Sequence, residues 1–211
     1  DIRRRNFIPP EAFPYKTPPG STYENADLPG LLDQALVLAD WNGFPKRRAA
    51  SEKKGLLRGI GISTVIENTG AGLFPKDEIE IDVAADGAVT VYTVSHSQGQ
   101  GHETTFAMIV AEALEVPTER VRIRQGDEDR PMIGNHAGGS RSTVGAGSAC
   151  HVTAKKLIEH GKALAALELG VEPSQVGYAH GEFRTRDSQR AVTLGDLAKA
   201  KTFSVKAEGS F

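Results

Sequence analysis

The stretch of residues 99–105, Gly-Gln-Gly-His-Glu-Thr-Thr, combines bare backbone with hydrogen-bonding side chains. Glycine lets the chain bend sharply and lie close to a ligand, and the amide of Gln100 both donates and accepts hydrogen bonds. The polar side chains that follow stand where a helix is expected to begin, and a helix N-terminus favours an anion such as phosphate. The pattern predicts a cradle for a phosphorylated ligand that also carries a hydrogen-bonding ring or oxo group.

A second glycine-rich stretch, residues 134–147, has a similar design. It contains Gly-Gly-Ser-Arg-Ser at 138–142, directly before a helix-compatible run. The serine hydroxyls and the planar guanidinium of Arg141 suit phosphate oxygens, whereas His136 either approaches the ligand or caps a turn. We expect the two loops to hold one dinucleotide-like ligand, although glycine turns before helices are also ordinary caps. Neither loop has the spacing of a Rossmann fingerprint or a P-loop.

Other polar side chains indicate simpler roles. His102 and Glu103 are adjacent and do not form the His-Glu-x-x-His zinc pattern, so Glu103 is interpreted as a favourable charge at a helix start. His96 and Ser97 lack an orienting carboxylate and a nucleophile elbow, which argues against nucleophilic catalysis. The acidic turn at 127–129 either binds a hard cation or is solvated, and solvation is favoured.

A hairpin and a helix are expected to hold the first loop. Residues 78–84 and 88–95 alternate apolar and polar around Asp86-Gly87. This pattern predicts a β-hairpin whose second strand runs into the loop. The run 103–115 carries apolar residues on one helical face. The first loop is therefore expected between a strand and a helix.

The second loop is expected between a short strand at 121–123 and a long alanine-rich helix at 148–169, in which Cys150 takes a packed position. The end of the chain, 175–211, is predicted to form paired strands with a short helix near 193–200. Strands and helices thus alternate irregularly, with clear antiparallel pairing. The sequence predicts an α+β fold, mixed, with largely antiparallel sheets and packed helices.

The first part of the chain differs from the rest in composition. Residues 1–55 are predicted to form an extended, proline-rich segment and a helical linker. Residues 56–68 are rich in aliphatic side chains and are predicted to form a buried strand, interrupted by two glycines. The α+β domain is expected over 56–211. It is expected to be incomplete, because the chain begins with Asp1 in a charged stretch and has the character of a piece of a longer polypeptide.

Composition excludes several classes of protein. The formal net charge is −2, and no concentrated basic face is expected, which argues against nucleic-acid binding. The single cysteine excludes internal disulfides and any cysteine-based zinc or iron–sulfur site in the chain. No secretory signal is visible, and no apolar run approaches the ~18 residues of a membrane span. A reducing, cytoplasmic location is therefore expected.

The order of the motifs is the most specific feature of the sequence. A hairpin ending in Gly-Gln-Gly-His-Glu-Thr is followed by a helix, a strand that ends at Gly126-Asp127, and Gly-Ser-Arg-Ser before a long helix. This order resembles the large, molybdenum-binding subunit of the xanthine dehydrogenase/aldehyde oxidase family, and within it the carbon monoxide dehydrogenase-like branch. The resemblance covers nearly all 211 residues and implies the molybdopterin-binding domain fold of that family.

The resemblance implies a molybdopterin cofactor in its cytosine dinucleotide form, with molybdenum held through the cofactor and not by protein side chains. It assigns cofactor contact to residues of both loops: Gln98, Gly99, Gln100, Gly101, Gly139, Ser140, Arg141 and Ser142. It implies oxidation of an aldehyde, an N-heterocycle or a CO-like substrate with oxygen from water. The partners it implies are the remainder of the large subunit and subunits or domains that carry iron–sulfur clusters and FAD.

The resemblance also shows what this stretch of sequence lacks. In such enzymes the base is a glutamate in a glycine-rich motif near the C-terminus of the large subunit, and no such motif occurs here. A Gly-Gly-Gly-Phe-Gly loop near the metal is absent too. We therefore expect no catalytic residue in this fragment and no activity from it alone. Two alternatives remain open: a cofactor-free binding or assembly module of the same fold, and a general nucleotide-phosphate binder.

Overall fold

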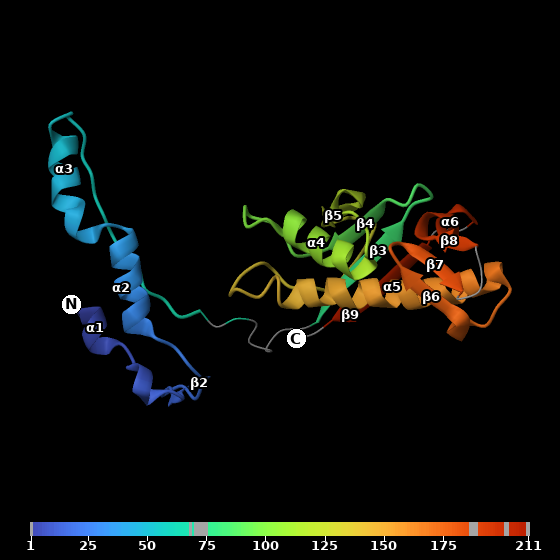
Figure 1. Cartoon of the computed structure of the whole chain (residues 1–211), viewed down its shortest axis with the longest axis horizontal. Helices are drawn as coiled ribbons and strands as arrows, with labels where there is room; N and C mark the ends of the chain where they lie inside the picture. Colours follow the sequence, from blue (N-terminus) through green and yellow to red (C-terminus); the bar gives the residue numbers. More distant parts are fainter. Residues whose placement is uncertain (1, 68, 70–75, 186–189, 201–202, 210–211) are drawn as a thin grey trace. The chain divides into compact units, whose positions relative to one another are not determined.

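The chain folds into two compact units, Asp1–Ile66 and Glu67–Phe211 (Figure 1). The computed structural model describes residues 2–67, 69, 76–185, 190–200 and 203–209. Among the described residues of the first unit, only Leu32 and Ser51 are buried. The second unit contains an extensive hydrophobic core, so it is the part of the chain with the packing expected of a globular domain.

The first unit is built mainly from helices. Its elements are α1 (Ile2–Asn6), η1 (Pro10–Ala12), β1 (Tyr15–Lys16), β2 (Thr22–Tyr23), α2 (Leu28–Leu38), η2 (Trp41–Gly43) and α3 (Phe44–Glu52). The carboxylate of Asp27 caps α2 by accepting a hydrogen bond from Gly30 N at 2.8 Å. Arg47 of α3 forms an ion pair with Asp40 and donates to Ala39 O at 2.9 Å. These contacts tie α3 to the end of α2.

The segment 56–67 contains no strand, so the buried strand predicted at 56–68 is wrong over its described part. The side chains of Leu57 and Val65 are 97% and 82% exposed. A strand needs a neighbour that satisfies its backbone hydrogen bonds, and none of the described strands pairs with this segment. The aliphatic residues of this segment suggested a buried strand, but composition does not show whether a neighbouring strand is present to pair with it.

A four-stranded sheet with the order β5-β4-β3-β9 forms the centre of the second unit. β3 (Asp77–Val83) and β4 (Val89–Thr93) form the predicted hairpin, with Asp86-Gly87 at its turn. β9 (Phe203–Gly209) pairs antiparallel with the whole of β3. β5 (Val121–Gln125) runs parallel to β4. The sheet is therefore mixed, with its antiparallel pairs around β3.

Two helices pack against one face of this sheet. α4 (His102–Leu114) connects β4 to β5, and the long helix α5 (Gly145–Leu169) extends along the second unit (Figure 1). Both correspond to predicted helices. Alternate residues of β3, such as Ile79 and Ile81, are fully buried and share one core with Phe106 of α4. This alternation is the pattern of a sheet with one apolar and one polar face.

A smaller sheet packs on the C-terminal half of α5. Its order is β6-β7-β8, and the elements of this region are η4 (Pro173–Gln175), β6 (Val176–Ala179), β7 (Glu182–Thr185), β8 (Ala191–Thr193) and α6 (Leu194–Ala200). A further short helix, η3 (Thr118–Arg120), lies between α4 and β5. Phe183 of β7 is fully buried. A Cβ atom at Gly161 of α5 would lie 2.3 Å from the Phe183 ring, so only glycine fits between helix and sheet here.

The predicted fold class is confirmed, since helices pack on mixed and antiparallel sheets. Cys150 is buried in α5, as expected. Burial, followed by the charge of Asp77, raises the pKa of its thiol to about 12. None of the helices in the described part of the chain combines the length and the apolar character that crossing a membrane requires.

Candidate functional site

The two glycine-rich loops meet at one pocket. Its volume is about 530 Å³. It is lined by residues of both loops: Gln98, Gln100, His102, Ala137, Gly138, Ser140, Arg141, Ser142 and Thr143. The first loop follows β4 and the second precedes α5, so both α4 and α5 begin beside the same pocket. The fold thus brings together the two stretches that the sequence singled out.

The predicted contact residues divide into two groups. Gln98, Gln100, Ser140, Arg141 and Ser142 line the pocket. Gly99, Gly101 and Gly139 belong to the same loops but lie outside its lining, and their φ angles are 101°, 78° and 56°. Glycine adopts such positive φ angles without steric penalty, so these three residues shape the loops. Contact of all eight residues with a ligand stays a prediction.

The side chain of Gln100 braces the first loop. Its Oε1 accepts a hydrogen bond from Gln98 N, and its Nε2 donates to His96 O at 3.4 Å. The sequence interpretation assigned this amide to a ligand alone. In the structure the amide also spans the turn, so the loop keeps its shape through its own contacts.

The first loop is also attached to β5 and α4. Ser97 N donates to Gln125 Oε1 at 2.5 Å. The pKa of Glu103 is lowered, first by a hydrogen bond from its own backbone N–H and then by the Ser97 hydroxyl. Glu103 is therefore a favourable charge at the helix start, as its position predicted. Its carboxylate also means that a phosphate at this end of α4 would meet a negative charge.

His102 is a pocket residue that the sequence interpretation missed. It is 3% exposed, and its ring stacks on Phe106 with 4.8 Å between the centroids. Its Nδ1 lies 3.3 Å from Ser95 O. Because a carbonyl oxygen only accepts, Nδ1 carries the proton in this contact. The signal that could have found His102 is its place as the first residue of α4, directly after Gly101.

In the second loop, Arg141 is held inside the protein. It is 6% exposed, and its Nε and Nη2 donate to His136 O at 3.2 and 2.9 Å. His136 thus contributes its carbonyl to the shape of the loop. Ser140 has a φ of 51°, a conformation uncommon for a residue other than glycine. A buried positive charge at the pocket favours an anionic group on a ligand.

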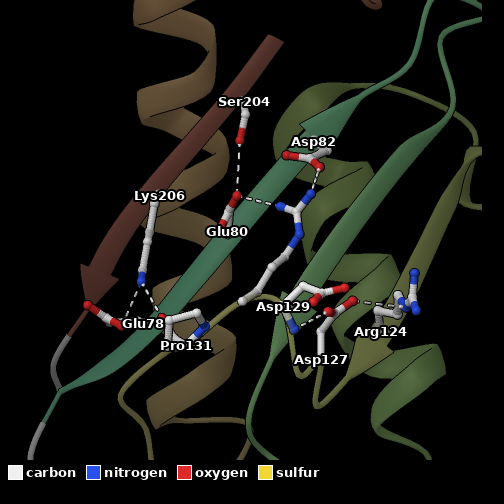
Figure 2. Close-up of polar contacts among 10 residues, drawn as sticks. Glu78, Glu80, Asp82, Arg124, Asp127, Asp129, Pro131, Ser204 and Lys206 are labelled. Atoms are coloured by element: carbon white, nitrogen blue, oxygen red, sulfur yellow. Dashed lines mark hydrogen bonds and ion pairs between the residues drawn. The ribbon is translucent and has the colours of Figure 1, made fainter. Parts of the chain in front are cut away.

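Arg130 fixes the segment that leads into the second loop to the polar face of the large sheet. It forms ion pairs with Glu80 and Asp82 of β3, with 2.6 Å between Nη2 and Asp82 Oδ2. Figure 2 labels these two carboxylates. Its guanidinium carbon lies 3.9 Å from the centre of the Tyr92 ring. The planar group can bind two carboxylates and stack on a ring at once.

The residues after Arg130, which lead into the second loop, follow β3. Glu78 N donates to Ile133 O at 2.8 Å, and Ile133 N donates to Glu78 Oε2 at 2.6 Å. Lys206 of β9 donates to Pro131 O at 3.0 Å and lies 3.1 Å from Glu78 Oε2 (Figure 2). The pKa of Glu78 is lowered, first by the Ile133 N–H and then by Lys206. We call residues 130–135 the anchored stretch.

In the acidic turn at 127–129, the carboxylate of Asp127 is used within the protein. Asp127 forms an ion pair with Arg124 at 3.4 Å and accepts a hydrogen bond from Asp129 N at 3.1 Å (Figure 2). Over the described residues, no three His, Cys, Asp or Glu side chains are grouped so that they could hold a metal ion. The contacts of Asp127 therefore stabilise the turn that follows β5.

Comparison with known proteins shows which family of proteins this chain resembles. Residues 34–211 match the family model described as molybdopterin cofactor-binding domain. The carbon monoxide dehydrogenase large chain of Afipia carboxidovorans is 33% identical over 95% of this chain and 27% of its own length. The 6-hydroxypseudooxynicotine dehydrogenase complex subunit gamma of Paenarthrobacter nicotinovorans is 29% identical over 99% of this chain. The chain spans about a quarter of the length of these curated relatives.

Solved structures share the fold. The reconstituted CO dehydrogenase from Oligotropha carboxidovorans matches all of this chain and 30% of its own with a TM-score of 0.64 and 30% identity. Quinoline 2-oxidoreductase from Pseudomonas putida 86 matches 99% of this chain and 30% of its own with a TM-score of 0.66 and 26% identity.

Proposed function

Because this chain belongs to the molybdopterin cofactor-binding domain family, in the branch with carbon monoxide dehydrogenase large chains, we propose that its pocket binds the cofactor as a cytosine dinucleotide. The single observation that carries this proposal is the meeting of the two glycine-rich loops at one polar pocket. In this proposal the chain is part of a larger subunit of a molybdenum hydroxylase.

The residues present fit such a ligand. A volume of about 530 Å³ lies within the range of roughly 300–1,000 Å³ that is usual for small-molecule sites. Amide and hydroxyl groups match the many donors and acceptors of pterin and cytosine rings. The buried charge of Arg141 balances the negative charge of a diphosphate.

The distribution of charge favours one orientation of the ligand. Glu103 places a carboxylate at the start of α4, beside the first loop. The first turn of α5 contains no acidic residue, and Arg141 lies just before it. In this proposal the second loop, with Ser140 and Ser142, would hold the phosphates. Gln98 and Gln100 of the first loop would hold the ring systems.

Bound molybdopterin supplies a molybdenum centre for the oxidation of an aldehyde, an N-heterocycle or a CO-like substrate with oxygen from water. The residues of this chain bind and orient that group. The base, the substrate-facing residues and the iron–sulfur and flavin partners come from other segments or subunits in a cytoplasmic complex. The 211 residues alone are therefore inactive.

The experiment is elemental and nucleotide analysis of the full-length parent enzyme. We expect Arg141→Met and Ser140→Ala to lower the content of molybdenum and of the CMP released by acid hydrolysis. Ser204→Ala is the matched control, because Ser204 lies on the polar face of the sheet beside Glu80 and should leave both contents unchanged. Unchanged contents in the Arg141 and Ser140 variants would contradict cofactor binding. Release of a different nucleotide would overturn the cytosine form alone.

A further inference from the structure

Asp77, the first residue of β3, is a buried carboxylate that the cofactor assignment does not use. It is 7% exposed. Its Oδ1 accepts hydrogen bonds from Asn135 N at 2.7 Å and from Asn135 Nδ2 at 3.2 Å. Asn135 is the last residue of the anchored stretch, and Ala137 is the first residue of the second loop that lines the pocket. One oxygen of Asp77 thus holds the loop immediately before the pocket.

The other oxygen of Asp77 lies at the far end of the same loop. A Cβ atom at Gly145, the first residue of α5, would lie 2.7 Å from Asp77 Oδ2. Gly145 N in turn donates to Arg141 O at 2.7 Å. A negative charge beside the first turn of a helix is favourable, and α5 has no acidic residue in that turn. The carboxylate therefore binds one end of segment 136–144, through Asn135, and lies beside its other end, at Gly145.

We propose that Asp77 is a positioning residue that closes segment 136–144 into the shape that faces the first loop. The proposal rests on the proposed function of the pocket, since the shape it preserves is the one that would receive the ligand. A loop whose two ends are fixed loses conformational freedom before the ligand arrives. Preorganisation of this kind strengthens binding without adding a contact to the ligand.

A substitution at Gly145 tests the proximity of Asp77 to α5 independently. It has no positive φ angle, so alanine suits its backbone and only the approach of Asp77 excludes a side chain. Gly145→Ala should therefore push the carboxylate away from α5. The same substitution in an Asp77→Ala background should have a much smaller effect, because the methyl group then has room.

Hydrogen exchange of the full-length parent enzyme tests the contact directly. We expect amides of 136–144 to exchange about tenfold faster in Asp77→Ala, since two hydrogen bonds to the loop are lost. Asp77→Asn keeps an acceptor for Asn135 and should restore most of the protection. Leu157→Ala is the control, because it removes a fully buried core side chain of α5. That control should speed exchange across the core without selecting this segment.

Cofactor content then decides whether the contact serves the pocket. We expect Asp77→Ala and Gly145→Ala to retain several-fold less molybdenum and CMP than Leu157→Ala after gel filtration. Unchanged exchange at 136–144 in Asp77→Ala would overturn the contact. Faster exchange with full cofactor content would overturn the positioning role. A wild-type enzyme without molybdenum and nucleotide would instead refute the proposed function, and the exchange data would still decide whether Asp77 holds the loop.

Discussion

The hydroxyl of Ser95 lies 3.5 Å from the hydroxyl of Ser142, and this contact joins the segment before the first loop to the second loop. Ser95 is 1% exposed and stands two residues after the end of β4. Ser142 belongs to the pocket lining. The segment between β4 and the first loop therefore contacts the second loop, so a substitution at either serine should affect the order of both loops.

The first prediction concerns this pair. Ser95→Ala and Ser142→Ala should each lower the free energy of local opening of the loops by about 0.5 kcal/mol, the low end for a hydrogen bond, because the contact is long. The double variant should lose less than the sum, since the second substitution removes nothing further. Hydrogen exchange of residues 95–101 and 136–144 measures these values. Strict additivity would mean that the hydroxyls do not interact.

The second prediction concerns Arg130. Arg130→Ala should destabilise the second unit by about 1.5–3 kcal/mol, the range for hydrogen bonds to charged groups, and leave two partly buried carboxylates unpaired. Arg130→Lys should recover only part of this, because an ammonium group cannot bind both carboxylates in one plane. Thermal unfolding measures the loss. The control is Arg184→Ala, which breaks an exposed pair with Glu182 and should change stability little.

The third prediction is a pH dependence. The pKa of Glu78 is lowered from its ordinary value of 4.5, so its stabilising contribution is complete above that value. This stabilising contribution of Glu78 is lost as the pH falls through its pKa in the folded state, which is lower than 4.5. Protection of residues 131–135 from exchange should fall with it, and Glu78→Gln should remove this part of the profile. Lys206→Met removes the second cause of the lowered Glu78 pKa but leaves the Ile133 N–H, so it should weaken the pH dependence without abolishing it. A profile that Glu78→Gln leaves unaltered would contradict the assignment.

The fourth prediction tests the contact between α5 and the small sheet. Gly161→Ala should destabilise the second unit by about 1–3 kcal/mol through overpacking against Phe183, although alanine is the better helix former. Phe183→Leu in the same background should recover part of the loss by making room. Glu168→Ala, on the exposed side of α5, is the control. Stabilisation by Gly161→Ala would show that the ring can move aside.

Patterns within a short stretch of sequence were sufficient to predict the hairpin and the two main helices, because these elements depend mainly on residues close together in the chain. Alternation placed Ile79 and Ile81 in the core, and Asp86-Gly87 marked the hairpin turn. Helical spacing located α4 and α5 within a few residues. The order of the two loops identified the family, and the match over residues 34–211 confirms it.

Contacts between distant segments could not be predicted in this way. Nothing in the sequence around Asp77 or Arg130 shows which carboxylate or loop each will meet, because that depends on how β3 and the second loop are brought together. For His102 the sequence only argued against a zinc motif, and its burial depends on packing against Phe106. The strand predicted at 56–68 failed for the same reason, since strand formation requires a partner that composition does not reveal.

The pairing of β9 with β3 has a consequence for synthesis of the protein. Val83 pairs with Phe203 and Asp77 with Gly209, whereas β4 follows β3 almost directly. The hairpin closes a short loop quickly, but β9 can join only after everything between has been translated. Until residues 203–209 leave the ribosome, β3 carries an open edge along the nascent chain. Open strand edges recruit other strands, so β3 can pair with strands of other chains during this interval.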